Sequence, residues 1–259
     1  MLMGYTLADI CFSYDNRAIF SGISLEMEAG CFHGVLGPNG SGKTTLLDLI
    51  TGHLKPQNGN ILLDGRPLDD LNVGELAKKC ALVPQDFRVN FPFTVAQVVM
   101  MGRYPHLGRF SAPEARDREL VEQAMAATGI SDFSLRHVTE LSGGERQRVV
   151  FARALTQDAP CLILDEAFSN LDIRHTLALM TLVADRVKHN GLTVISVMQD
   201  LNLAARFCGS LLFLKNGRVA AHGTVDEVFT ESVIKAVFDV SSRVYFDETI
   251  HCKQVVFLN

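Results

Sequence analysis

The sequence predicts an α/β fold with a mainly parallel sheet, an N-terminal antiparallel β subdomain and an inserted helical subdomain. Residues 160–230 alternate short apolar strands with helices, a pattern typical of parallel strands covered on both faces. Residues 1–63 contain strands separated by turn residues, whereas residues 87–159 have helical patterns without a convincing strand. We expect a single domain over residues 1–259, with a core at about 1–86 and 160–230, a helical subdomain at about 87–159 and a short C-terminal extension at about 231–259.

The order of the elements follows from apolar periodicity and turn residues. Before the insertion we expect strands at 7–14, 23–28, 32–36, 60–63 and 80–83, and a helix at 43–51. Within the insertion, Thr94 with Gln97 and Ser111 with Glu114 fit capping boxes that begin helices. After it we expect strands at 161–164 and 192–197, helices at 173–189 and 201–207, and a hairpin of 211–214 with 218–221 around an Asn-Gly turn.

The composition is that of an ordinary globular protein and argues against several classes. Apolar residues make up 47% and charged residues 20% of the chain, which excludes wholesale disorder. The formal net charge of −5 argues against a nucleic-acid partner. No stretch approaches the roughly 18 apolar residues of a membrane span, and no secretory signal is visible at the N-terminus. The six cysteines are widely spaced, so we expect free thiols in a reducing compartment rather than disulfides or a metal site.

Residues 37–44, GPNGSGKT, match the phosphate-binding pattern G-x-x-x-x-G-K-[ST] between an expected strand and an expected helix. Glycines let successive N–H groups face an anion, and the helix start adds its positive dipole end. Lys43 is expected to reach the β and γ phosphates, and the Thr44 hydroxyl to ligate magnesium. This motif alone does not separate kinases, GTPases, helicases and transport ATPases. The candidate ATP-binding residues here are Gly37, Pro38, Asn39, Gly40, Ser41, Gly42, Lys43, Thr44 and Thr45.

A second apolar strand ends in two adjacent acids, Asp165 and Glu166. A buried strand that delivers a carboxylate to its C-terminal edge is the Walker B arrangement. Asp165 is expected to hold magnesium through water. Glu166 is then available to orient and polarise the attacking water.

A third segment, LSGGE, begins an apolar helical run and consists of Leu141, Ser142, Gly143, Gly144 and Glu145. Ser142 and Glu145 fit a capping box, and the paired glycines leave the N–H groups of the first turn uncovered. Such a helix start is suited to binding a phosphate.

With these three segments, the chain resembles the nucleotide-binding subunit of an ATP-binding cassette (ABC) transporter, whose signature is LSGGE. The resemblance extends over about residues 3–230 with the motifs in the family's order. It implies a P-loop NTPase core of the RecA-like type, ATP as substrate and Mg²⁺ as cofactor. It also implies that Tyr14 stacks on adenine, that Gln85 approaches the magnesium and the attacking water, and that Asp172 lies in the D-loop at a dimer interface.

The resemblance further implies partners. Two cassettes meet head to tail as a homodimer, so Ser142 and Gly144 act on the ATP of the other subunit, and the hydrolysis by a monomer is weak. Two transmembrane permease subunits supply the spans, and a periplasmic or extracellular substrate-binding protein acts through them. The implied location is peripheral, on the cytoplasmic face of the inner (plasma) membrane.

One position departs from the family's pattern. The switch histidine normally follows a strand as H-D-L, but this sequence has Gln199 before Asp200 and Leu201. Glutamine can still donate a hydrogen bond to the γ-phosphate, although it carries no positive charge. Weakening one charged hydrogen bond predicts a barrier higher by roughly 1–3 kcal/mol. Either this subunit hydrolyses ATP slowly by nature, or the residue at 199 was altered to trap the ATP-bound dimer.

The segment FPFT at 91–94 and the following VVMMGRYPH resemble cassettes that import iron chelates, haem or cobalamin. Apolar side chains here are candidates for a groove that receives a helix of the permease: Phe87, Val89, Phe91, Phe93, Met100 and Met101. The alternatives are a cassette for another substrate, such as molybdate, and a non-transport ABC protein. That last class usually carries two cassettes or a coiled-coil insertion, which this chain lacks.

Overall fold

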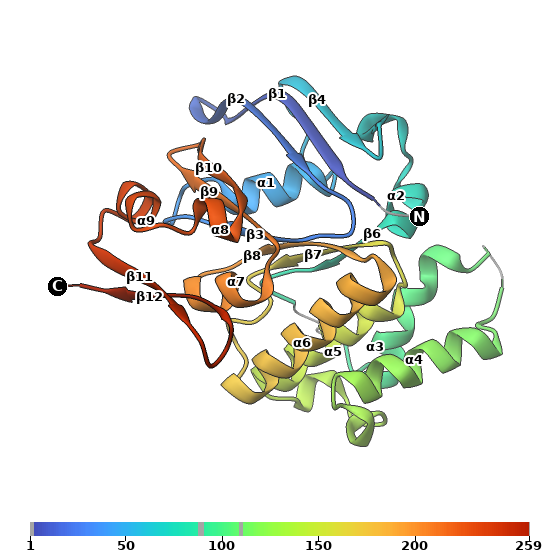
Figure 1. Ribbon diagram of the computed structural model, residues 1–259. Helices are drawn as coiled ribbons and strands as arrows, with labels where there is room; N and C mark the ends of the chain where they lie inside the picture. The colour runs from blue at the N-terminus through green and yellow to red at the C-terminus, as the bar shows by residue number, and fades with distance from the viewer. Residues whose placement is uncertain (1–2, 88–90, 109–110, 259) are drawn as a thin grey trace. The chain divides into compact units, whose positions relative to one another are not determined.

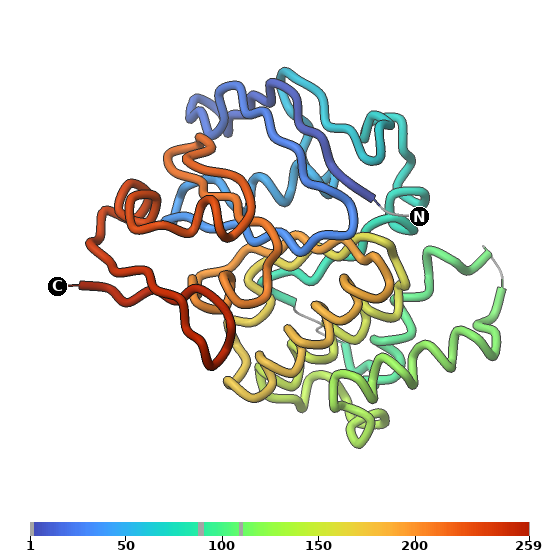
Figure 2. The backbone as a smooth tube through the Cα atoms, viewed as in Figure 1, coloured from blue at the N-terminus to red at the C-terminus, as the bar shows by residue number. Residues whose placement is uncertain are grey.

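The computed structural model of the chain describes residues 3–87, 91–108 and 111–258 (Figure 1). The chain divides into two compact units, whose backbone can be followed in Figure 2. The first combines Met1–Leu71 with Ala184–Asn259, and the second is Asn72–Val183. The subdomain boundaries expected from the sequence stay a prediction.

The first unit contains an antiparallel sheet in the order β2-β1-β4-β5, as the sequence predicted for the N-terminal part. Its strands are β1 (Tyr5–Tyr14), β2 (Arg17–Met27), β4 (Asn58–Leu63) and β5 (Arg66–Pro67), and a 3₁₀ helix, η1 (Leu68–Asp70), follows. Alternating apolar residues form the buried side of these strands, among them Tyr5, Leu7, Ile10, Phe20 and Ile23. The strand predicted at 23–28 begins earlier than expected, because β2 pairs with β1 along its length.

The same unit contains strands in the order β8-β3-β9-β10. They are β3 (Phe32–Leu36), β8 (Thr193–Val197), β9 (Ser210–Lys215) and β10 (Arg218–Thr224). β3 is parallel to both β8 and β9, and β9 and β10 form the predicted hairpin. Every residue of β3 and β8 is buried, as expected for parallel strands covered on both faces. Helix α1 (Lys43–Ile50) follows β3, and α7 (Leu201–Phe207) follows β8.

The C-terminal part of this unit consists of two short helices and a hairpin. The helices are α8 (Val225–Val228) and α9 (Glu231–Phe238), and the hairpin strands are β11 (Ser242–Asp247) and β12 (Cys252–Phe257). The two strands pair antiparallel, with Val244 opposite Val255. β12 packs along α7 (Figure 1).

The second unit joins a parallel strand pair to a set of helices. Its elements are α2 (Val73–Lys79), β6 (Cys80–Val83), α3 (Val95–Met100), η2 (Met101–His106), α4 (Ala115–Ala127), η3 (Ser131–Phe133), η4 (Val138–Glu140), α5 (Gly143–Thr156) and β7 (Cys161–Asp165), while α6 (Ile173–Asn190) begins in it. β6 and β7 are parallel. Between them, residues 91–108 and 111–159 contain no strand beyond an isolated bridge from Thr94 to His137, so the predicted helical character is confirmed.

One of the two predicted capping boxes in the insertion is confirmed, and the other is wrong. Thr94 and Gln97 exchange the expected bonds at the start of α3. Ser111 does not begin a helix: α4 starts after Glu114, whose N–H donates to Asp117 Oδ2 at 2.9 Å. Asp117 also accepts a 2.8 Å bond from Arg103 Nε. The buried Arg103 holds the Asp117 side chain in place. Asp117 therefore bonds Glu114 N, and α4 begins after Glu114 instead of after Ser111.

In the described ranges, no helix is long and apolar enough to cross a membrane. The six cysteines are all free thiols. No cluster of three or more His, Cys, Asp or Glu side chains suited to a metal ion occurs within those ranges.

Candidate nucleotide-binding site

The loop of residues 37–42 connects β3 to α1 in the first unit and has a backbone that needs glycine. Gly37 and Gly42 adopt φ values of +154° and +104°. A Cβ at Gly37 would lie 2.1 Å from the Leu214 carbonyl oxygen, and one at Gly42 would lie 2.7 Å from the Phe20 ring. Substitution at either position would therefore displace the loop or the strands beside it.

The polar groups of this loop are arranged as an anion-binding cradle. The Lys43 ammonium donates to the carbonyls of Gly37 and Pro38 at 2.8 and 3.0 Å, so it lies against the loop. Ser41 Oγ is buried without a hydrogen-bond partner in the described part of the chain. No side chain caps α1 at Gly42, and an added Cβ at Gly40 meets no atom within 4 Å. Uncapped N–H groups beside a cation and an open position suit a phosphate.

The other candidates from this loop differ in exposure. Thr44 is exposed in the first turn of α1, whereas Thr45 is buried. Pro38 is half-buried, and Asn39 is exposed. A hydroxyl that is exposed beside the cradle suits a hard cation such as Mg²⁺, which prefers oxygen ligands.

Tyr14 ends β1 with its ring partly exposed. The ring packs edge-on against Phe12, with centroids 4.9 Å apart and planes at 87°. Tyr14 is 45% exposed, so part of its ring is accessible to a planar ligand.

The second unit brings Gln85 and Glu166 together, although they are far apart in the sequence. Gln85 Nε2 donates to Glu166 Oε2 at 3.1 Å. Glu166 follows β7 in a left-handed conformation with φ +48°, and its carbonyl accepts bonds from Ser169 N and Oγ at 3.1 and 2.9 Å. Asp165, the last residue of β7, is buried. The strained backbone at Glu166 is a feature that the sequence pattern did not reveal.

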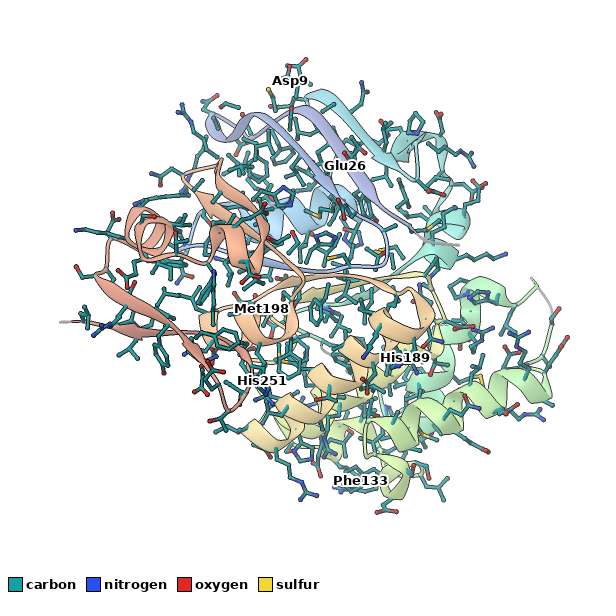
Figure 3. All side chains as sticks on the ribbon, viewed as in Figure 1. Asp9, Glu26, Phe133, His189, Met198 and His251 are labelled. Carbon is teal, nitrogen blue, oxygen red and sulfur yellow. The ribbon has the colours of Figure 1, made fainter. Side chains whose placement is uncertain are left out.

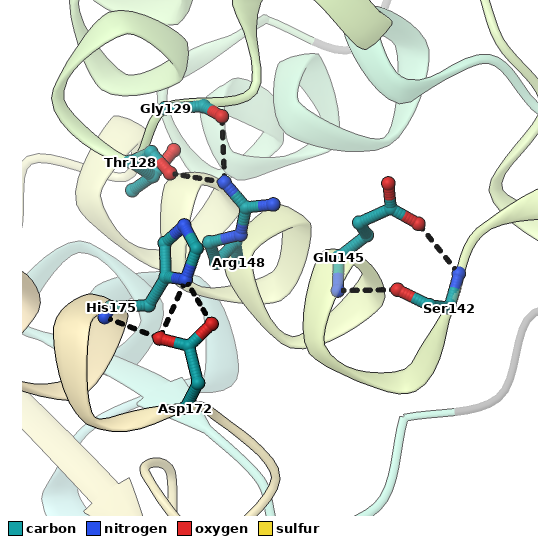
Figure 4. Close-up of polar contacts among 7 residues, drawn as sticks. All are labelled: Thr128, Gly129, Ser142, Glu145, Arg148, Asp172 and His175. Carbon is teal, nitrogen blue, oxygen red and sulfur yellow. Dashed lines mark hydrogen bonds and ion pairs between the residues drawn. The ribbon is translucent and has the colours of Figure 1, made fainter.

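The signature segment forms the capping box that the sequence predicted (Figure 4). Ser142 N donates to Glu145 Oε2 at 2.8 Å, and Glu145 N donates to Ser142 Oγ at 3.3 Å. The bond from the Ser142 backbone lowers the pKa of the Glu145 carboxyl. Leu141 is buried and anchors the segment. An added Cβ at Gly143 meets no atom within 4 Å, so the start of α5 is bare within this unit.

Asp172 directly precedes α6 and is fixed by a local partner. It accepts bonds from His175 N at 2.9 Å and from His175 Nδ1 at 2.8 Å (Figure 4). The bond from the His175 backbone is the main cause that lowers the pKa of the Asp172 carboxyl. Gly144 approaches the same loop, because its added Cβ would lie 3.2 Å from the Asn170 carbonyl oxygen.

Gln199 lies in the three-residue segment between β8 and α7 in the first unit, where it and Asp200 are exposed. Met198, labelled in Figure 3, is buried before it, and Met198 N donates to Val35 O at 3.1 Å. Asp200 after it caps α7 by accepting from Leu203 N at 3.0 Å. The position is thus held between a buried anchor and a helix cap.

The apolar residues that the sequence proposed as a docking groove differ in exposure. Phe91 and Phe93 are 67% and 37% exposed, with ring centroids 6.2 Å apart. Phe87 is half-buried, with the Arg153 guanidinium 4.5 Å above its ring. Met100 and Met101 are half-buried, and Val89 lies outside the described residues. Sequence reasoning missed Tyr104, which is 60% exposed in η2.

Residues 20–169 match the family described as ABC transporter. The chain is 42% identical over 229 residues to the cobalamin import ATP-binding protein BtuD of Halobacterium salinarum, covering 88% of this chain and 57% of that protein. It therefore spans little more than half the length of that relative. It is 40% identical over 245 residues to the hemin import ATP-binding protein HmuV of Rhizobium meliloti, covering 92% of each.

Two solved structures have the same fold. One is described as a metal-chelate type ABC transporter in an inward-facing conformation. It has a TM-score of 0.85 and 26% sequence identity, and the match covers 100% of this chain and 98% of that one. The dimeric structure of MJ0796, a bacterial ABC transporter cassette, has a TM-score of 0.76 and 27% identity, over 85% and 98%. The predicted P-loop NTPase fold is confirmed by these similarities.

Proposed function

Because the chain belongs to the ABC transporter family, we propose that it is the ATP-hydrolysing, nucleotide-binding subunit of an importer. The observation that carries the proposal is the cradle at 37–42, where Gly37 and Gly42 adopt positive φ and Lys43 lies against the loop. Ser41 Oγ is buried there without a hydrogen-bond partner among the residues that the structure describes. This geometry supports the binding of a nucleoside triphosphate by its phosphates.

Binding uses the residues of the first unit. The Lys43 ammonium exchanges its two carbonyl partners in the loop for phosphate oxygens, which are stronger, charged acceptors. The N–H groups of the loop and the Ser41 hydroxyl donate to the same anion. The partly exposed Tyr14 ring stacks on the adenine ring.

We propose three oxygen donors as Mg²⁺ ligands on the strength of their motifs, since Mg²⁺ prefers hard oxygen ligands. They are the Thr44 hydroxyl in the first unit, and the Asp165 carboxylate and the Gln85 amide oxygen in the second. When bound, this ion supplies positive charge at the phosphate oxygens and so offsets the charge of the transition state. The Asp165 side chain is buried, which keeps the carboxylate in one orientation.

Glu166 is the proposed general base. Its carboxylate orients the attacking water and accepts a proton from it. The bond from Gln85 Nε2 and the bonds from Ser169 to the Glu166 carbonyl restrict where that carboxylate can lie. Gln199 is proposed to donate a hydrogen bond to the γ-phosphate, as the histidine of the family does.

We further propose a homodimer in which residues 141–145 of one subunit meet the ATP of the other, with Asp172 at the interface. The bare start of α5 at Gly143 and the dimeric state of the MJ0796 cassette support this arrangement. The permease subunits would dock near Phe91, Phe93 and Tyr104, which are exposed. The subunit would then lie peripherally on the cytoplasmic face of the inner membrane, below a periplasmic or extracellular substrate-binding protein.

The proposed cargo is an iron-siderophore, haem or cobalamin-type compound. Its support is the similarity to relatives named for cobalamin and hemin import. The test is ATP-dependent uptake of each compound by the chain reconstituted with its permease in liposomes. Uptake of molybdate instead would favour the alternative cargo.

Glu166→Gln tests the hydrolytic role, because glutamine keeps the shape of the side chain but is a poor proton acceptor. We expect ATPase activity to fall by about 10²- to 10⁴-fold while ATP binding and ATP-dependent dimerisation persist. Lys43→Ala is the matched variant that should lose binding itself. Hydrolysis at the wild-type rate in Glu166→Gln would refute the assigned base, and a wild-type chain that does not bind ATP would refute the function.

A further inference from the structure

The side chain of Asn202 joins α7 to the C-terminal hairpin. Its Oδ1 accepts a 2.7 Å bond from Val255 N, and its Nδ2 donates a 3.2 Å bond to Val255 O. Both backbone groups of Val255 are thus occupied by one amide, in the manner of a neighbouring strand. Val255 is only 4% exposed, so this contact is protected from competing water.

The opposite edge of the hairpin is held in a matching way. Val244 lies across from Val255 in the register, and Val244 N donates to Glu231 Oε1 at 3.0 Å. Glu231 is the first residue of α9. A two-stranded hairpin is only marginally stable by itself, and here its central residue pair is bound by a side chain on each outer edge. The hairpin is therefore fixed against α7 rather than fraying from it.

Asn202 lies three residues after Gln199, in the first turn of α7. On the other side of Gln199, Met198 is buried, and its Sδ lies 3.7 Å from Cys208 Sγ. The segment that carries Gln199 therefore spans a short distance between two anchored residues. The anchor before Gln199 belongs to the core. After Gln199, the Asp200 cap on Leu203 N and the buried Leu201 hold the start of α7, and Asn202 adds its bonds to the C-terminal hairpin.

We propose that Asn202 is a positioning residue through which the C-terminal hairpin fixes the segment bearing Gln199. This inference rests on the proposed function, in which Gln199 donates to the γ-phosphate. Losing the Asn202 bonds removes the contact of the first turn of α7 with the hairpin, so this turn loosens and Gln199 samples orientations that do not reach the transition state. ATP binding depends on Tyr14 and the loop at 37–42, neither of which Asn202 contacts through the bonds given above.

The test measures steady-state ATPase activity of the full-length chain over a range of MgATP concentrations, with thermal unfolding in parallel. For Asn202→Ala we expect kcat to fall roughly threefold to tenfold, the usual effect of one net hydrogen bond, with KM unchanged. Asn202→Asp keeps the shape and the acceptor for Val255 N but places a carboxylate oxygen against Val255 O, where two acceptors repel. Its kcat should fall at least as far as that of Asn202→Ala. Gln254→Ala is the matched control, because within the described residues that amide bonds Cys252 and Lys253 of its own strand.

A double variant separates positioning from a purely structural role. If Asn202 acts through Gln199, adding Asn202→Ala to Gln199→Ala should lower kcat no further than Gln199→Ala does alone. Wild-type kcat in Asn202→Ala, additive losses in the double variant, or an equal loss in Gln254→Ala would each overturn the inference. A wild-type chain without ATPase activity would instead overturn the proposed function, so the two failures are distinguishable.

Discussion

Replacing Gly143 by alanine separates the proposed nucleotide contact of the α5 start from the stability of the helix. An added Cβ at Gly143 meets no atom within 4 Å, and its φ lies outside the left-handed region. Alanine in a helix is more stable than glycine by roughly 0.5–1 kcal/mol. We therefore expect Gly143→Ala to unfold at the same temperature as the wild type or slightly above it.

The activity should change in the opposite direction. In the proposed dimer the first-turn N–H groups of α5 donate to the ATP of the partner subunit. A methyl group placed there keeps the phosphate at a distance, and a hydrogen bond to a charged group is worth about 1.5–3 kcal/mol. Since about 1.4 kcal/mol corresponds to a tenfold change in rate, ATPase activity should fall by roughly 10- to 100-fold.

The assay combines thermal unfolding, steady-state ATPase activity and ATP-dependent dimerisation by light scattering. Gly74→Ala is a close control, because Gly74 occupies the first turn of α2 behind another capping box, formed by Asn72 and Glu75. A Cβ added at Gly74 would lie 3.3 Å from Asn72 Oδ1. The Gly74→Ala variant should keep the wild-type ATPase activity. Full ATPase activity in a stable Gly143→Ala chain would refute a nucleotide contact at this helix start.

Three further outcomes are expected. Gln199→His should raise the ATPase rate of the assembled transporter roughly 10- to 100-fold by restoring a charged donor, and an unchanged or lower rate contradicts this. Asp117→Asn should lower the unfolding free energy by about 3 kcal/mol in urea titrations, because it leaves the Arg103 charge unpaired in a pair whose side chains are 8% and 9% exposed. Burial lowers the pKa of His33. At a pH between its folded and unfolded pKa values, His33 is therefore neutral in the folded chain and protonated in the unfolded chain. Stability should then fall as pH drops below about 6.5, less steeply in His33→Gln, and equal slopes in urea titrations at several pH values would contradict this.

The elements that carry the motifs could be predicted closely from the sequence. The strands at Phe32–Leu36 and Cys80–Val83 and the helix at Leu201–Phe207 have the predicted bounds. The two strands are short apolar runs followed by Gly37 and Pro84, and the helix begins directly after its capping residue Asp200. The apolar pattern and the turn or capping residues therefore indicate the same bounds. The Ser142–Glu145 box was predictable for the same reason, because its two partners are three residues apart.

The features that could not be predicted depend on partners far apart in the chain. The start of α4 depends on Arg103, which holds Asp117, so the local pattern at Ser111 had no effect. The bonds between Asn202 and Val255 join residues 53 positions apart. No local spacing rule contains such information, because it arises only when the strands and helices have packed.

The left-handed conformation of Glu166 shows why these distant partners matter for the proposed chemistry. A non-glycine residue with φ +48° costs roughly 1–3 kcal/mol and persists only where its surroundings enforce it. Here Ser169 bonds the Glu166 backbone carbonyl and Gln85 bonds its carboxylate, so two other residues hold the backbone and the side chain of Glu166. In the proposal above, Asn202 acts on Gln199 indirectly, through the first turn of α7. In both places the motif supplies the reactive group, and a residue outside the motif restricts its orientation. Because catalysis tolerates displacements of only about 0.5 Å, loss of such a partner should lower kcat before it weakens ATP binding.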